Sequence, residues 1–446
     1  MAGTDSPQVS PTDLDPATAP RQTGSMMNQI GRFRWVICAL LLFGTTKNYM
    51  DRQVIGLLKP TLQHDLGWSE VDYGHLVSVF QGAYAIGMLV VGRLIDSLGT
   101  RISYALAVAA WSLASMAHGA ISSFGAFLGA RFALGFGESA VFPASLKATA
   151  EWFPRQERAL ATGIFNAGTN LGAAITPFIV AVVVARWGWR SAFFVIGGLG
   201  YVWLAFWLLI YRKPEQHRRC SEAELRYIRS DPSGPPSKVR WLSLIPHRQT
   251  WAFALGKLII DPIWWFYLFW IPDFLFKQYG MDLHHVTWPI LIIYALADAG
   301  SVAGGWLSSA LMRSGKSANI ARKTAMLVCA VSVTPIIFTP LVHSVWGAIL
   351  LLGLATAAHQ GFSANLFTLP LDIFPATAVA SVVGIGGMMG ALGGMFSAEI
   401  VGYSLQWTGS YRIPFLIAGC AYLIALGVIH LLAPRLDAVQ LTPAET

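Results

Sequence analysis

Three ionisable side chains lie inside a stretch of sequence that is otherwise apolar enough to cross a bilayer. Lys47, Asp51 and Arg52 interrupt the hydrophobic run from Phe33 to Leu58. Charged groups at membrane depth cost free energy, so they are expected to face protein or water and to mark a functional site. On a helix Lys47 and Asp51 can pair along one face, whereas Arg52 points about 100° away. We therefore expect the free guanidinium of Arg52 to hold an anion while Asp51 handles a proton.

A second pair of opposite charges lies in the apolar run from residue 122 to 148. Arg131 and Glu138 are seven residues apart, which on a helix returns them to one face about 10 Å apart along its axis. Burial disfavours a charged carboxylate unless a cation is near, so the affinity of Glu138 for a proton should depend on its arginine neighbours. A substrate anion that draws Arg52 or Arg131 away would change this pairing, which offers a physical route for coupling anion binding to proton binding. The alternative is a static structural pair between Arg131 and Glu138.

The four-residue spacing of the first Lys–Asp pair recurs at Lys257 and Asp261, 210 residues further along the chain. Either these two charges neutralise each other, or the lysine helps to bind an anion. Pro262 follows Asp261 directly and interrupts helix hydrogen bonding, which fits a gating bend. Some of the aromatic residues that follow must belong to the belt at the membrane interface, and we expect Trp270 with Pro272 to do so.

The composition indicates a polytopic membrane protein. Of the 446 residues, 54% are hydrophobic and 12% are charged, and the charged share is about half that of a typical soluble domain. About twelve hydrophobic runs are long enough to span a bilayer as helices, which predicts an all-α membrane protein. They cover roughly residues 33–58, 72–96, 101–120, 122–148, 158–186, 190–211, 251–277, 286–312, 320–341, 344–371, 377–407 and 411–433.

The distribution of Lys and Arg predicts the orientation of the chain. The net charge of +8 could suggest a nucleic-acid partner, but the basic residues form no stripe with interleaved aromatics. They gather instead in alternate loops, most densely between residues 212 and 250. By the positive-inside rule we expect a multi-pass protein of the cytoplasmic (inner) membrane, with both termini cytoplasmic and no nucleic-acid partner.

The polar stretch between residues 212 and 250 divides the apolar spans into two halves. The recurring Lys–Asp pair supports an internal repeat in parallel orientation, as in a six-plus-six transporter. The expected segments are a disordered cytoplasmic N-terminal tail (1–30), an N-terminal six-helix bundle (31–211), a cytoplasmic central loop (212–250), a C-terminal six-helix bundle (251–433) and a cytoplasmic C-terminal tail (434–446).

Several motifs resemble those of one transporter family. Gly92 to Arg101 is similar to the loop signature of the major facilitator superfamily, Gly-x-x-x-Asp-x-x-Gly-x-Arg. More narrowly, the chain resembles the anion:cation symporters of that superfamily through Asn48 to Arg52, Arg131 with Glu138, and Trp152 to Arg158. The strings Asp261 to Tyr267 and Ala358 to Asn365 are most similar to hexuronate transporters. This resemblance implies twelve transmembrane helices in two pseudo-symmetric six-helix bundles.

The resemblance also implies roles for particular residues. Asp51 and Glu138 correspond to protonation sites, and Arg52 corresponds to a ligand of the substrate. Tyr84 aligns with a tyrosine that contacts the substrate in the family.

The charged turn after the second span is expected to act as a gate. By resemblance, Asp96 and Arg101 cap and pair across helix ends near the cytoplasmic face and stabilise the outward-open state. Ordinary interfacial charges are the alternative. Ser309 stands in the second half where many relatives carry Asp, so we expect the gate contacts of the two halves to differ.

A sugar acid would need one anchor for its carboxylate and several for its hydroxyls. We expect the carboxylate on the fork of Arg52 and the ring stacked on Trp264 or Trp265. Polar contacts between helices are the alternative role for the hydrogen-bonding side chains. The expected substrate-binding set is Arg52, Tyr49, Tyr84, Lys47, Arg131, Asn166, Lys257, Asp261, Trp264, Gln360 and Asn365.

We therefore expect a proton-coupled symporter that imports a sugar-acid anion, most similar to a hexuronate carrier, and not an enzyme. Ser314 to Ser317 resembles the end of a nucleotide-binding loop but lacks its first glycine and a preceding strand, so no cofactor is expected. The scattered cysteines show no metal or disulfide spacing. The expected partners are a small organic anion, protons and membrane lipid, and the protein is expected to be a monomer.

The alternatives are a carrier of galactonate, glucarate or another small carboxylate, a proton-independent exchanger or uniporter, and a transporter-like receptor. Protonatable groups at Asp51 and Glu138 favour symport over the proton-independent carriers, and the lack of an output domain argues against a receptor. The identity of the sugar acid and the number of protons stay open.

Overall fold

The computed structural model describes residues 31–230 and 241–439, apart from a few side chains such as that of Asp96. This part of the chain contains helices and no strand, which confirms the all-α prediction. The predicted tail at residues 1–30 lies outside it, as do residues 231–240 of the predicted central loop and 440–446 of the predicted C-terminal tail.

The helices follow one another with short connections. The first half of the chain forms α2 (Phe33–Leu66), α3 (Glu70–Leu98), α4 (Thr100–Ala120), α5 (Phe124–Glu138), α6 (Val141–Trp152), α7 (Arg155–Trp187) and α8 (Trp189–Ile210). A connector follows with η2 (Pro214–Gln216), α9 (Glu222–Ile228) and η3 (Trp241–Leu244). The second half forms α10 (Arg248–Tyr279), α11 (Thr287–Arg313), α12 (Ala318–Val333), η4 (Thr334–Leu341), α13 (Val345–Ile373), α14 (Ala376–Thr408) and α15 (Arg412–Leu432).

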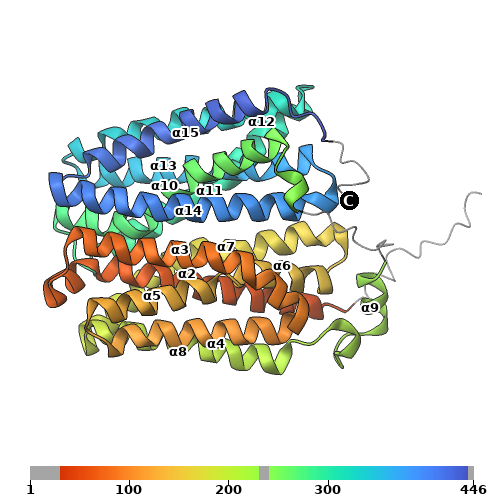
Figure 1. Ribbon diagram of the computed structural model, residues 1–446, viewed down its shortest axis with the longest axis horizontal. Coiled ribbons are helices and arrows are strands. Elements are labelled where there is room, and N and C mark those ends of the chain that lie inside the picture. Colours follow the sequence, from red (N-terminus) through yellow and green to blue (C-terminus); the bar gives the residue numbers. More distant parts are fainter. Residues whose placement is uncertain (1–30, 231–240, 440–446) are drawn as a thin grey trace, which may run out of the picture.

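Figure 1 shows the long helices lying side by side in two groups. Helices α2 to α8 form the lower group and α10 to α15 the upper group. The start of α2, the α9 connector and the C-terminal segment lie at the same end of the molecule, on the right of the view. We call this end the terminal end and the opposite one the distal end.

The predicted spans correspond closely to the observed helices, with two exceptions. The span from 122 to 148 is broken between α5 and α6 at Ser139 and Ala140. Pro143 explains the break, because it has no N–H to donate to the carbonyl of Ser139 and its ring crowds that carbonyl. The span from 320 to 341 changes from an α-helix to a 3-10 helix at Thr334, directly before Pro335.

Within the described residues, nine helices are long and apolar enough to cross a membrane. The charged helix α2 is not among them, and α5 and α6 have only 15 and 12 residues, fewer than the roughly 20 that a bilayer requires. Helix α4 is not among the nine either, so the charges of α2 and the break between α5 and α6 account for two of the three predicted spans that miss this test.

Small residues let the two halves approach closely. A Cβ added to Gly74 of α3 would lie 2.9 Å from the carbonyl oxygen of Ala398 and 3.2 Å from the Cα of Gly402, both on α14. A Cβ added to Gly56 of α2 would lie 3.2 Å from the carbonyl oxygen of Phe269 on α10. Backbones at this separation leave no room for a larger residue, so α2 and α3 pack directly on α10 and α14.

Helix α10 is buried over most of its length. It runs as one helix through Pro262 and Pro272, so the gating bend at Pro262 stays a prediction. The prediction that Trp270 belongs to the interfacial belt is wrong. Its side chain is buried, and its ring meets the edge of Tyr73 on α3 with 5.3 Å between centroids. The residue faces the opposite half rather than lipid.

A cluster of charges joins the halves at the distal end. Lys59 of α2 lies 2.7 Å from Glu70 Oε2 of α3 and 2.5 Å from Asp273 Oδ2 of α10. Lys277 contacts both of these carboxylates, and the hydroxyl of Tyr411 donates a hydrogen bond to Asp273. Lys59 and Asp273 are fully buried. We call these five residues the distal charge cluster, and its contacts close this end of the interface between the halves.

Candidate functional site

The first Lys–Asp pair lies in the middle of α2, and its predicted pairing is confirmed. Lys47 Nζ is 2.5 Å from Asp51 Oδ2, and both side chains are buried. Two serines of α4 complete the site: Lys47 donates to Ser112 Oγ at 3.0 Å, and Ser115 Oγ donates to Asp51 Oδ1 at 2.7 Å. The pair is thus fixed by hydrogen bonds from a neighbouring helix, which the helix periodicity alone did not predict.

Arg52 is paired, which corrects the expectation of a free guanidinium. Its Nε lies 2.7 Å from Glu138 Oε2, and Arg52 is only 2% exposed. Glu138 is the last residue of α5 and sits directly before the helix break. Its other oxygen, Oε1, has no hydrogen-bond partner among the described residues.

Aromatic rings surround the guanidinium of Arg52. The carbon Cζ lies 5.0 Å from the ring centroid of Tyr49, 5.2 Å from that of Phe80 and 4.8 Å from that of Tyr84. The fourth ring, that of Trp265, is 5.0 Å away and belongs to α10 of the second half. Faces of aromatic rings attract a cation, so Arg52 is held at the contact between the two halves. Tyr49 and Tyr84, two predicted substrate contacts, lie beside it.

Arg131 is fully buried but does not pair with Glu138, so the alternative of a static pair between them is not observed. Its Cζ lies 4.8 Å from the ring centroid of Phe80, which also contacts Arg52. Within the described part of the chain, Nε and Nη2 of Arg131 have no hydrogen-bond partner. A buried cation with open donors can receive an anion.

The second Lys–Asp pair also forms, on α10. Lys257 Nζ lies 2.8 Å from Asp261 Oδ2, with side chains 7% and 18% exposed. Lys257 lies over the ring of Phe367, 4.2 Å from its centroid. A Cβ on Gly390 of α14 would lie 2.1 Å from Asp261 Oδ2, so the carboxylate occupies the space that this glycine leaves.

The predicted aromatic and amide residues of the second half have different neighbours. Trp264 stacks on His359, with centroids 5.0 Å apart and planes 13° apart. His359 Nδ1 and the hydroxyl of Tyr422 are 2.6 Å apart. Asn365 donates to the carbonyl oxygens of Gly304 and Gly361, each at 2.9 Å. These contacts of Asn365 are those expected of polar packing between helices, the alternative role that the sequence left open.

Gln360 takes part in a polar contact that crosses between the halves. Its Nε2 lies 3.5 Å from Oδ1 of Asn170 on α7, and Asn170 in turn donates to Asp298 on α11. Asn166, one turn earlier on α7, is exposed. Asn170 was not among the predicted site residues, although a polar amide inside an apolar span was a signal for it.

Two buried glutamines were also missed. Gln53 on α2 and Gln81 on α3 are both completely buried, and neither amide has a hydrogen-bond partner among the described residues. Gln81 and Trp265 both adjoin Gly394, since a Cβ there would lie 3.2 Å from Gln81 Cδ and 2.7 Å from Trp265 Cδ1. The open amide of Gln81, near Trp265, is suited to hydroxyl groups of a ligand.

The predicted gate at the terminal end is described only in part. Arg101 Nη2 donates to the carbonyl oxygen of Leu208 at 2.5 Å, so it caps the last turn of α8. The side chain of Asp96 lies outside the described residues, and its pairing with Arg101 stays a prediction. In the second half, Arg322 pairs with Asp372 at 3.1 Å and donates to Ser308 at 3.0 Å.

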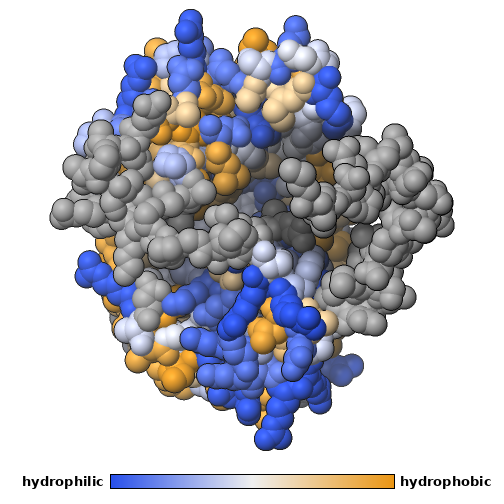
Figure 2. All heavy atoms as spheres, turned by 90° about the vertical axis from the view of Figure 1, so that its right-hand side faces the viewer, coloured by the Kyte–Doolittle hydropathy of each residue, from blue (hydrophilic) through white to orange (hydrophobic). Residues whose placement is uncertain are grey.

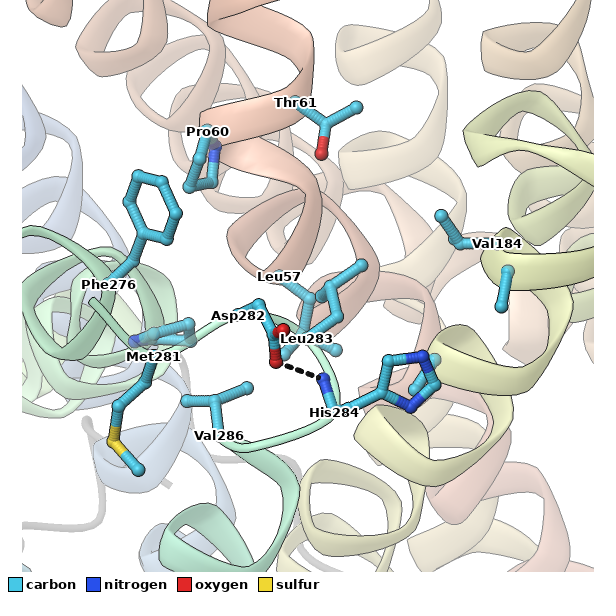
Figure 3. Close-up of a pocket in the computed structure, with 13 residues that line it drawn as sticks. Leu57, Pro60, Thr61, Val184, Phe276, Met281, Asp282, Leu283, His284 and Val286 are labelled. Atoms are coloured by element: carbon cyan, nitrogen blue, oxygen red, sulfur yellow. Dashed lines mark hydrogen bonds between the residues drawn. The ribbon is translucent and has the colours of Figure 1, made fainter.

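A crevice of about 250 Å³ lies at the distal end, between the two halves. Figure 3 shows Leu57, Pro60 and Val184 facing Phe276 and the loop from Met281 to Val286 across it. The loop is folded on Asp282, whose Oδ1 accepts hydrogen bonds from the backbone N–H groups of His284 and His285. The bond from His285 N–H and the His285 ring hold the pKa of Asp282 below its usual value. The apolar walls of this crevice do not suit a sugar-acid anion.

Comparisons with known proteins agree with this architecture. The family model described as Major Facilitator Superfamily matches residues 41–398. The chain is 32% identical to the hexuronate transporter of Escherichia coli (strain K12), over 84% of this chain and 88% of that protein. It is 33% identical to the galacturonate transporter of Dickeya chrysanthemi, over 63% of this chain and 83% of that protein.

A solved structure shares the fold. The inward-facing, occupied structure of a bacterial homolog of the human lysosomal transporter Spinster matches with a TM-score of 0.72 and 17% sequence identity, covering 90% of this chain and 97% of that one. The likeness confirms the predicted fold of two pseudo-symmetric six-helix bundles.

Proposed function

The chain belongs to the Major Facilitator Superfamily, a superfamily of transporters and not of enzymes, and on this premise we propose that it is a proton-coupled symporter that imports a hexuronate. The observation that carries this proposal is the buried ion pair between Arg52 and Glu138, 2.7 Å long, at the contact between the two halves. The likeness to hexuronate and galacturonate transporters supports the class of substrate.

Coupling follows from competition for one arginine. The guanidinium of Arg52 matches a carboxylate, and a substrate carboxylate that binds it takes the place of Glu138. A buried Glu138 that has lost its cation is stabilised by taking up a proton. Anion and proton then bind to the same state of the protein, which is the requirement for symport.

Arg131 supports a second contact with the anion. Its guanidinium and that of Arg52 both lie against Phe80, and two of its nitrogens are open. A hexuronate offers a carboxylate and several hydroxyl oxygens as acceptors. The carboxylate goes to Arg52 and the neighbouring oxygens to Arg131.

The hydroxyls and the ring of the sugar contact residues from both halves. Tyr49 and Tyr84 of the first half and Trp265 of the second already enclose Arg52. Trp265 is the ring that stacks on the sugar, because it lies beside the guanidinium of Arg52, whereas Trp264 stacks on His359. A ligand that touches both halves changes the free energy of their relative positions, which is the basis of alternating access.

The Lys47–Asp51 pair is a second candidate for proton transfer. An inside-negative membrane opposes the entry of an anion by about 2.3 kcal/mol per charge for each 100 mV. One cotransported proton at Glu138 cancels this opposition, and a second at Asp51 would let the membrane potential drive uptake.

We infer that the structure is in an inward-facing conformation, because the distal charge cluster closes the end that lies opposite the termini. The cluster closes the distal end through ion pairs between the halves. We propose that the termini and the basic connector are cytoplasmic, in the inner membrane, as the distribution of Lys and Arg favours. The closed end then faces outward, and the cluster must separate for the substrate to enter.

The test is uptake of radiolabelled galacturonate and glucuronate into proteoliposomes, with and without an inward proton gradient. We expect wild type to accumulate one or both sugar acids under the gradient, with competition from galactonate and glucarate measured in parallel. Glu138→Gln should lose gradient-driven accumulation but keep counterflow exchange, because a neutral glutamine leaves Arg52 open to the anion and carries no proton.

Glu222→Gln, at an exposed position of α9, is the matched control and should transport as wild type does. The hexuronate assignment would be refuted if wild-type protein took up neither acid but still bound another organic anion. Accumulation that persists in Glu138→Gln would refute the coupling step and assign the proton to Asp51. Exchange without any response to the gradient would identify an exchanger.

A further inference from the structure

A pocket of about 410 Å³ lies at the terminal end, where α8 ends and the connector begins. It lies far along the helices from Arg52 and shares none of the residues expected to bind the substrate. In Figure 2, which faces the terminal end, hydrophilic residues gather over the lower part, where the first half lies. The residues that line the pocket are Phe33, Leu209, Ile210, Arg212, His217, Arg218 and Arg219.

The three arginines of this pocket, which we call the connector arginines, are exposed, and no ion pair engages them among the described residues. The neighbouring carboxylates are occupied by other cations. Arg34 pairs with Glu157 at 2.7 Å and with Glu224 at 3.3 Å, and Arg229 pairs with Glu215 at 2.8 Å. The pocket therefore carries positive charge that its surroundings do not neutralise, and guanidinium groups in such a place favour a phosphate or carboxylate.

His217 forms a fixed wall of the pocket. Its ring stacks on Phe33 of α2, with centroids 4.2 Å apart, and Nε2 lies 3.0 Å from the carbonyl oxygen of Ile210. The backbone N–H of Arg219 donates to Nδ1 at 3.1 Å. Partial burial and then the charges of Arg212 and Arg219 lower the pKa of His217. The ring is therefore neutral near pH 7, and it positions Arg219 through the backbone N–H of that residue.

The apolar side of the pocket opens toward lipid. Leu209 is 76% exposed at the last turn of the membrane-spanning helix α8, and Phe206 and Leu208 of the same helix are exposed as well. The end of an apolar span lies at the level of lipid headgroups. We propose that this pocket binds the phosphate headgroup of an anionic phospholipid, with the phosphate on the connector arginines and an acyl chain along Leu209. A free anion would gain nothing from the exposed leucine, whereas a lipid uses both surfaces.

The experiment measures lipid binding to purified protein by native mass spectrometry, with phosphatidylglycerol and phosphatidylcholine as the probes. The variant Arg218→Gln/Arg219→Gln removes two charges from the pocket. The control Arg226→Gln/Arg248→Gln also removes two charges. Both positions are exposed and neither lines the pocket. We expect the pocket variant to bind phosphatidylglycerol about 30-fold more weakly than wild type, from the usual contribution of basic residues near anionic lipid. The control should bind as wild type does.

Thermal unfolding in detergent without lipid verifies that both double variants are folded. A further arm adds inorganic phosphate at millimolar concentration in place of lipid, and we expect no stabilisation of wild type from it. Equal binding of phosphatidylglycerol by the pocket variant and the control would overturn the proposal. Equal affinity of wild type for phosphatidylcholine, or stabilisation by inorganic phosphate that matches that by phosphatidylglycerol, would also overturn it.

Discussion

The two Lys–Asp pairs occupy corresponding places in the two halves but have different surroundings. Lys47–Asp51 lies on the first helix of the first half and Lys257–Asp261 on the first helix of the second, and each lysine precedes its aspartate by four residues. Serines of α4 bond to both members of the first pair, and the pair is buried. No such hydrogen bonds hold the second pair among the described residues, and Asp261 is 18% exposed.

The difference indicates that the first pair is fixed in place, whereas the second pair can exchange a partner for a ligand. A buried pair that neighbouring serines also bond is difficult to disturb, and a proton that reaches Asp51 must displace its contacts with Lys47 and Ser115. A pair at the edge of solvent can exchange its partner at lower cost. Both pairs have the same four-residue spacing, and the neighbouring helices decide which pair a ligand can reach.

The largest expected difference is in stability after loss of the lysine. Lys47→Met leaves Asp51 buried without its cation, and removal of one partner of a buried pair costs about 3–5 kcal/mol. Lys257→Met should cost less than this, since the side chain of Asp261 is 18% exposed and that of Asp51 is fully buried. Thermal unfolding of both variants in detergent measures the two losses.

The double variant Lys47→Met/Asp51→Leu is the control for this comparison. Replacement of both charges by apolar groups should recover most of the lost stability. Equal losses for Lys47→Met and Lys257→Met would show that burial does not distinguish the pairs.

A glycine packs on each pair, and these glycines provide a second, smaller test. A Cβ on Gly200 would lie 1.9 Å from Ser112 Oγ and 2.8 Å from Lys47 Nζ, inside a buried network. Gly200→Ala should destabilise the protein by about 1–3 kcal/mol through overpacking. Gly390→Ala should change stability less, because the partly exposed side chain of Asp261 can shift as a whole, but it should raise the KM for transport.

Gly198→Ala on α8 and Gly384→Ala on α14 are the matched controls, since a Cβ at either position meets no atom within 4 Å. Both should unfold and transport as wild type does. If Gly390→Ala left KM unchanged while Gly200→Ala altered it, the accessible pair would be the first one and the comparison would be reversed.

The sequence predicted what depends on neighbours along the chain. Runs of apolar residues located the spans, and helix geometry predicted the pairing of Lys47 with Asp51. The partner of Arg52 is Glu138, 86 residues away, and depends on how α5 faces α2. The seven-residue spacing on one helix suggested Arg131 as the partner of Glu138, because periodicity carries no information about the residues of the opposite helix.

The same limit applies at the distal end. Lys59 and Asp273 are 214 residues apart, and no pattern along the chain connects them. Trp270 lies near the end of its span, which favoured the interfacial belt, yet its ring faces Tyr73 of the other half. Distance from the helix end predicts depth in the membrane, whereas the direction of a side chain depends on the packing of the two halves.

The smallest expected difference concerns the aromatic ring below each lysine. Lys257 Nζ lies 4.2 Å from the ring centroid of Phe367, and Lys47 Nζ lies 5.5 Å from that of Trp111. A double-mutant cycle of Phe367→Leu with Lys257→Met should give a coupling of about 0.5–1 kcal/mol, the usual range for a cation over a ring. The corresponding cycle of Trp111→Leu with Lys47→Met should give less. Lys47 is already held by Asp51 and Ser112 and lies further from its ring, so a larger coupling at Trp111 would mean that the ring, rather than the serines, fixes the first pair.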